Sequence, residues 1–70
     1  MKLTIDPEAD ALYLTLKEGK VSRTEKLADG LIVDLNETGA LLGIELLWLS
    51  DRVAPETLAN LNIELPLVKK

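Results

Sequence analysis

Histidine, cysteine and phenylalanine are absent from this 70-residue sequence, and Tyr13 and Trp48 are its only aromatic residues. Without histidine or cysteine, nucleophile–base pairs of the Ser-His and Cys-His kinds cannot form. The lack of cysteine also excludes a disulfide framework and a zinc knuckle, and it makes a reducing cytoplasm the expected compartment. Glycine patterns of the Walker and dinucleotide-binding types are missing as well. Any catalysis would therefore depend on carboxylates, lysines, hydroxyl groups or Tyr13, and no cofactor is expected.

Positive charge is scarce too. Eight basic against twelve acidic side chains give a net charge of −4, which does not attract phosphate backbones or anionic lipid. Nucleic acid and membranes are therefore not expected partners. The longest apolar run, residues 46–49, is far too short for a membrane span, and Asp6 follows the start too closely for a signal peptide.

Hydrophobic residues, in contrast, are abundant: they make up 47% of the chain, and sixteen of them are leucines. A chain of this length forms one domain, residues 1–70, whose interior is small. This interior holds fewer apolar side chains than the composition supplies. The sequence offers no disulfide and no obvious metal site that would reinforce the fold. The sequence therefore predicts a homodimer or a larger homo-oligomer.

Period-two alternation and turn residues divide the first fifty residues into strand-sized pieces. Asp6-Pro7 forms a turn with Asp6 as an Asx acceptor, Asp29-Gly30 predicts a type I′ hairpin, and the loop at residues 36–39 is expected to end in a left-handed glycine. The predicted fold is of the α+β class and mostly β, an antiparallel β-meander of about five strands at residues 2–5, 11–16, 21–28, 31–35 and 40–49.

The last twenty residues follow a different pattern. Pro55 and Glu56 suit a first helical turn, which predicts one short helix over residues 55–61 that buries Leu58 and Leu61. The alternating segment 63–68 is interrupted by Pro66, which cannot donate to a central ladder, so it is interpreted as an extended tail laid on a sheet edge of its own chain or of a neighbour.

The predicted strand at residues 40–49 is apolar on both sides and must therefore be covered twice. Trp48 is expected in the core or in a self-association interface, since so large a side chain is seldom exposed. The sequence thus predicts a self-association interface along this strand, made by Leu42, Ile44, Leu46, Leu47, Trp48 and Leu49.

Three segments together resemble one known family. They are KLTIDPEADALYL at residues 2–14, DGLIVD at 29–34 and GIELL at 43–47, with Gly39 between the last two. In this order they resemble the DUF2283 family of small prokaryotic proteins over about residues 2–50. The resemblance implies no activity, substrate or catalytic residue. Its association with toxin-like neighbours implies an antitoxin-like, partner-binding role.

Two groups of carboxylates are candidates for chemistry. Asp6, Glu8 and Asp10 can converge on Ca²⁺ or Mg²⁺, which prefer oxygen ligands. The segment lacks the glycine and the distal glutamate of a calcium loop, however, and turn formation and solubility are the preferred explanation. Asp34 and Glu45 are placed on one face of adjacent strands, where a carboxylate of raised pKa acts as an acid or base, or where both are simply solvated.

The leading functional hypothesis is therefore a homo-oligomeric protein-interaction module that binds a further protein partner. The alternative is a small carboxylate-based enzyme or a protein that binds a metal or a small ligand. A flat apolar patch that remains exposed after self-assembly favours the module, and a crowded acidic pocket beside Trp48 favours the alternative.

Overall fold

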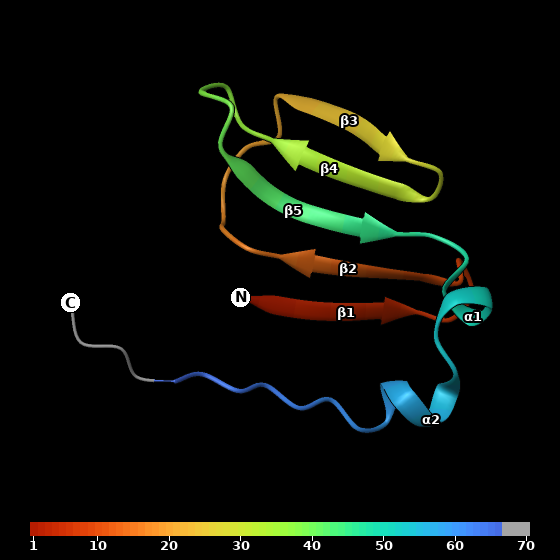
Figure 1. Ribbon diagram of the computed structural model, residues 1–70. Coiled ribbons are helices and arrows are strands. Elements are labelled where there is room, and N and C mark those ends of the chain that lie inside the picture. Colours follow the sequence, from red (N-terminus) through yellow and green to blue (C-terminus); the bar gives the residue numbers. More distant parts are fainter. Residues whose placement is uncertain (67–70) are drawn as a thin grey trace.

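Short alternating segments become five strands in the computed structural model, which describes residues 1–66 (Figure 1). All the strands pair antiparallel, so the predicted class, a mostly-β antiparallel fold, is confirmed. The strands are β1 (Lys2–Asp6), β2 (Ala11–Thr15), β3 (Arg23–Ala28), β4 (Leu31–Leu35) and β5 (Leu41–Leu46).

The order of the strands differs from the sequential order of a meander. It is β1-β2-β5-β4-β3, so β2 lies beside β5 and the polar strand β3 lies at the far edge. Residues 17–22 make this crossing: the Lys17 amide donates to the Leu42 carbonyl at 3.1 Å and the Ser22 amide to the Leu35 carbonyl at 2.8 Å. The order places the apolar strand β5 in the centre and gives the exposed edge to charged residues, which tolerate solvent.

The turns use the residues that the sequence singles out. Asp6 Oδ1 accepts hydrogen bonds from the Glu8 and Ala9 amides at 3.1 and 3.3 Å, which confirms the Asx turn, and Gly39 has the expected positive φ of 86°. The type I′ prediction at Asp29-Gly30 is wrong, because only Gly30 has a positive φ, 76°. A register shift between Lys26 and Ala28 accompanies this hairpin, and such a bulge supplies local twist that a two-residue I′ turn would otherwise give.

The pairing register gives the sheet two faces of opposite character. On one face Thr4, Tyr13, Glu45, Ile32 and Lys26 follow one another across the five strands, and we call it the polar face. The opposite side, called the apolar face below, consists of Leu3, Ile5, Leu12, Leu14, Leu31, Val33, Ile44 and Leu46.

The chain leaves the sheet earlier than predicted. The strand expected over residues 40–49 ends at Leu46, because Trp48 adopts a left-handed conformation with φ 52° and ψ 50°. Two short helices follow, α1 (Leu49–Arg52) and α2 (Pro55–Leu58), instead of the single helix predicted over 55–61. Pro55 begins α2 as expected, but Leu61 lies beyond the helix and is 65% exposed.

The described chain continues to Pro66 without further helix or strand (Figure 1). We call residues 60–66 the C-terminal segment. The predicted tail at 63–68 falls partly within it, while Leu67 and Val68 lie outside the described residues.

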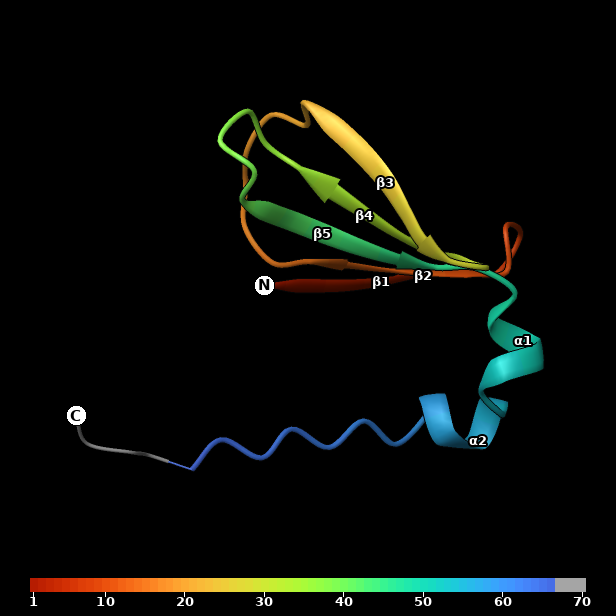
Figure 2. The same ribbon diagram turned by 45° about the horizontal axis from the view of Figure 1, so that its top comes forward.

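Few apolar side chains are buried in this single sheet. Ala11, Val33, Leu42 and Leu49 are the hydrophobic residues that reach burial within residues 1–66. The helices lie beyond one end of the sheet instead of covering it (Figure 2). No helix in that part of the chain is long and apolar enough to cross a membrane.

Candidate functional site

A hydrogen-bonded cluster occupies the middle of the polar face. The Tyr13 hydroxyl donates to Asp34 Oδ2 at 2.6 Å, and the Thr24 hydroxyl donates to Asp34 Oδ1 at 2.7 Å. Glu45 lies directly opposite Tyr13 in the β2–β5 pairing. The structure therefore brings the predicted Asp34–Glu45 pair onto one face, together with two hydroxyl groups.

Gly43 makes this cluster possible. It pairs with Asp34 on one side and with Thr15 on the other, and a Cβ atom built on it would lie 2.5 Å from Cζ of Tyr13. The Tyr13 ring therefore crosses β5 over a position that has no side chain, and from there its hydroxyl reaches Asp34 on β4. Any larger residue at position 43 would displace the ring.

The electrostatics of the cluster keep Tyr13 protonated. The hydrogen bond to Asp34 is the largest cause that raises the pKa of Tyr13, to about 12, followed by burial and by the negative charges of Asp34 and Glu45. A phenol in this state is a hydrogen-bond donor and not a base. Both oxygens of Asp34 accept hydrogen bonds from hydroxyl groups of the chain, so the cluster connects β2 and β3 to β4.

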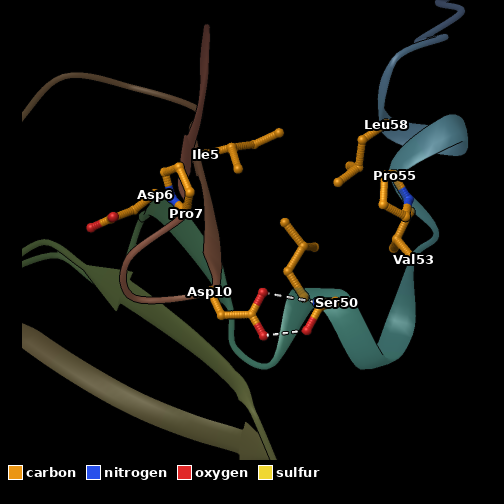
Figure 3. A pocket seen from close by; sticks show the side chains of 9 residues that line it. Ile5, Asp6, Pro7, Asp10, Ser50, Val53, Pro55 and Leu58 are labelled. Atoms are coloured by element: carbon orange, nitrogen blue, oxygen red, sulfur yellow. Dashed lines mark hydrogen bonds between the residues drawn. The ribbon is translucent and has the colours of Figure 1, made fainter.

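In the acidic turn at Asp6, Glu8 and Asp10, two of the three carboxylates accept hydrogen bonds from the chain itself. Asp6 accepts from amides within its own turn. Asp10 instead turns to α1, where its carboxylate accepts from the Ser50 amide at 2.9 Å and from the Ser50 hydroxyl at 2.7 Å (Figure 3). Among residues 1–66 no three carboxylates gather into a site that could hold a metal ion, so the metal hypothesis finds no support there.

The hollow beside this contact has a volume of about 210 Å³. Ile5 of β1, Pro7 of the turn, Val53 between the two helices and Leu58 of α2 line it (Figure 3). Its only carboxylates are Asp6 and Asp10, and each is already hydrogen-bonded within the chain. The hollow thus offers an apolar wall but no arranged polar group for a ligand.

Trp48 lies at the corner where the sheet meets α1. Its ring faces Gly30, where a Cβ would lie 2.9 Å from the ring, and the guanidinium carbon of Arg52 lies 5.9 Å from the ring centroid. Arg52 also donates to the carbonyls of Leu47 at 2.8 Å and Asp29 at 2.7 Å. Trp48 remains 46% exposed, so of its two predicted places the core is wrong, while the self-association interface stays a prediction. The charged group over its ring is the guanidinium of Arg52 and not a carboxylate.

The predicted interface residues separate into three groups. Leu42 and Leu49 are each only 3% exposed and serve the interior of the single chain. Leu47 and Trp48 follow β5 at the end of the sheet, and Ile44 and Leu46 lie on the apolar face. The interface itself stays a prediction, and within the single chain Leu42 and Leu49 offer almost no surface to it.

An open apolar surface lies elsewhere, next to β1. A hollow of about 540 Å³ separates this part of the apolar face from the C-terminal segment, and it is lined by Met1, Leu3, Leu12, Leu14, Leu61 and Ile63. Sequence reasoning missed it because it placed the most apolar strand, β5, in the interface. The alternation of Leu3 and Ile5 with Lys2 and Thr4 was the signal that pointed to β1.

Comparison with known proteins gives one match. The model of a family described as Protein of unknown function (DUF2283) matches residues 2–50. These residues contain all five strands, the polar cluster and the beginning of α1. Neither a curated protein nor a solved structure matches the chain.

Proposed function

Because the chain belongs to the DUF2283 family, proteins of unknown function, we propose from its own geometry that it is a protein-interaction module that assembles as a homo-oligomer. The observation that carries this proposal is the uncovered apolar face. A stable sheet needs a second layer over its hydrophobic side, and the two short helices lie beyond the end of the sheet (Figure 2). A second copy of the chain is the layer that we assign to this face.

The face is suited to a second copy because its eight residues bear no charge. Two chains with a net charge of −4 each repel one another, so their contact must keep carboxylates apart. The charged side chains on that side of the sheet, Arg23 and Glu25, belong to the far edge strand β3 and pair with each other at 3.3 Å. Two apolar faces can therefore meet without burying an unpaired charge.

The exposed apolar side chains are numerous enough for their burial to offset the cost of association. Six apolar residues line the hollow or neighbour it, and their exposed fractions add up to about four fully exposed side chains. They are Met1, Leu3, Ile5, Leu61, Ile63 and Leu65. Burying them contributes about 6–12 kcal/mol per copy, or about 12–24 kcal/mol for two copies. Association costs about 4–15 kcal/mol, which burial on this scale can offset.

This proposal places the interface on β1, β2 and the exposed parts of Ile44 and Leu46, instead of along the whole segment 42–49. A heterologous protein partner, of the antitoxin-like kind that the family resemblance implies, would use the same face. It would compete with self-association, because both partners cover the same side chains.

Two glutamate substitutions on neighbouring residues of β1 test the proposal. Leu3 lies on the apolar face and Thr4 on the polar face, so Leu3→Glu places a charge in the interface and Thr4→Glu adds the same charge on the opposite side. Sedimentation velocity should show that Leu3→Glu weakens self-association at least tenfold while Thr4→Glu stays close to the unmodified chain. Equal behaviour of both variants, each with an unchanged circular dichroism spectrum, contradicts the proposal.

A further inference from the structure

The two edges of the sheet are protected very differently. β3 presents Arg23, Glu25 and Lys26, the ion pair between Lys26 and Asp29 at 3.7 Å, and a register shift. Charges and bulges of this kind discourage another strand from pairing with an edge. β1 at the opposite edge pairs with β2 in an unbroken register, and its three central residues, residues 3–5, are uncharged.

The C-terminal segment has the pattern of a strand without a partner. Leu61, Ile63 and Leu65 alternate with Asn62 and Glu64, and the three apolar side chains are 65%, 78% and 79% exposed. The last backbone hydrogen bond in the described chain is donated by the Asn60 amide to the Thr57 carbonyl. Among residues 1–66, the backbone groups between Asn60 and Pro66 therefore have no partner and can pair with another strand.

We propose that the C-terminal segment of one copy pairs with the outer edge of β1 in a second copy and extends its sheet by one strand. This inference rests on the proposed self-association and specifies its geometry. Leu61, Ile63 and Leu65 continue the apolar face beside Leu3 and Ile5. Asn62 and Glu64 lie on the polar face, where the carboxylate of Glu64 complements the ammonium group of Lys2.

The partner is a second copy because the segment is held away from its own sheet. Residues 49–58 turn the chain below the end of the sheet, and the segment then runs beneath the apolar face, not beside the β1 edge (Figure 2). The hollow of about 540 Å³ lies between the two. Exchange between copies lets the segment lie beside Leu3 and Ile5 of a second copy, which are 40% and 41% exposed in the single chain.

Introduced cysteines test this pairing directly, since the natural sequence has none. One chain carries Thr4→Cys, and a second chain of distinguishable mass carries Glu64→Cys or Asn62→Cys. The two variants cover the pairing registers in which Thr4 lies opposite residue 64 or opposite residue 62. Ile63→Cys is the matched control, because its side chain projects to the opposite face from Thr4. In a strand pair, only residues on the same face direct their Cβ atoms to the same side and close enough for a disulfide, whereas the Cβ atoms of Thr4 and residue 63 point apart.

After mild oxidation of mixed chains, mass spectrometry should show a disulfide-linked dimer of Thr4→Cys with Glu64→Cys or Asn62→Cys, at least fivefold more than with Ile63→Cys. Equal yields from all three segment variants overturn the inference. So does an intramolecular disulfide in the Thr4→Cys/Glu64→Cys double variant without the intermolecular one, because the segment then pairs with its own β1. If the unmodified chain self-associates but the cysteine variants give no such disulfide, this inference is overturned and the proposed function stands. A monomeric unmodified chain overturns both.

Discussion

The hydroxyl group of Tyr13 on β2 donates to the carboxylate of Asp34 on β4 at 2.6 Å, although strand β5 lies between these two strands. The bond spans β5 at Gly43, the position over which the aromatic ring lies. The bond thereby ties β2 to β4 across β5 on the polar face. Within the single chain, this contact is a source of order on the polar face.

Gly43→Ala is expected to destabilise the fold. The added Cβ would lie 2.5 Å from Cζ of Tyr13, so the ring must move and the bond to Asp34 is lost, at a cost of about 1–3 kcal/mol. Gly19→Ala is the control, since its Cβ meets only a flexible methyl group of Leu42 at 3.0 Å. Urea denaturation should place the Gly43→Ala midpoint clearly below that of Gly19→Ala, and equal midpoints contradict the role of the ring.

The raised pKa of Tyr13 predicts a loss of stability in alkali. Its folded-state pKa of about 12 exceeds the ordinary value of 10.0, so the folded chain holds this proton more tightly than the unfolded chain does. The resulting stabilisation is complete below pH 10 and disappears as the pH rises from 10 to about 12. Phenolate absorbance should titrate near pH 12 in the unmodified chain and at lower pH in Asp34→Asn, and an unchanged titration in that variant contradicts the assignment.

Asp10 is expected to hold α1 against the β1–β2 turn. It has a positive φ of 53° and accepts both hydrogen bonds from Ser50. Asp10→Ala removes the acceptors and strains the backbone, which should cost about 2 kcal/mol, whereas asparagine tolerates this conformation and keeps one acceptor. Thermal unfolding and hydrogen exchange at the Ser50 amide compare the two variants. Equal losses for alanine and asparagine contradict a role for the side chain.

Arg52 is expected to fix the position of Trp48. Lysine cannot reproduce two hydrogen bonds from one planar group, so Arg52→Lys should lose about 1 kcal/mol of unfolding free energy and loosen the indole ring. The single tryptophan reports this change as red-shifted emission and faster acrylamide quenching. Arg23→Lys at the edge strand is the control, and the account is contradicted if both variants change the emission equally.

Local patterns predicted most of the fold but not its connections. The period of two in residues 11–15 placed Tyr13 opposite the leucines, and Asp6 and Gly39 marked their turns. The neighbour of β2 could not be read in the same way, because pairing with β5 depends on a crossing loop and on the fit of Tyr13 over Gly43. These two residues are 30 positions apart in the sequence, and only the assembled sheet shows that they touch.

The end of β5 was mispredicted for a related reason. Leu47, Trp48 and Leu49 continue the apolar character of the strand, so hydropathy alone predicts that the strand continues. The contact of Trp48 with Gly30 and the bond from the Leu49 amide to the Asp10 carbonyl at 2.8 Å accompany the left-handed turn instead. Of the candidate site residues, the Asp34–Glu45 pair was placed correctly on one face, while its partners Tyr13 and Thr24 depended on the strand order.

Sedimentation equilibrium of the unmodified chain at micromolar concentration tests the central claim most directly. The uncovered apolar face predicts a species of at least twice the 7.7 kDa mass of one chain, which dissociates on dilution. A folded 7.7 kDa species over the whole micromolar range, with the native circular dichroism spectrum, would contradict it.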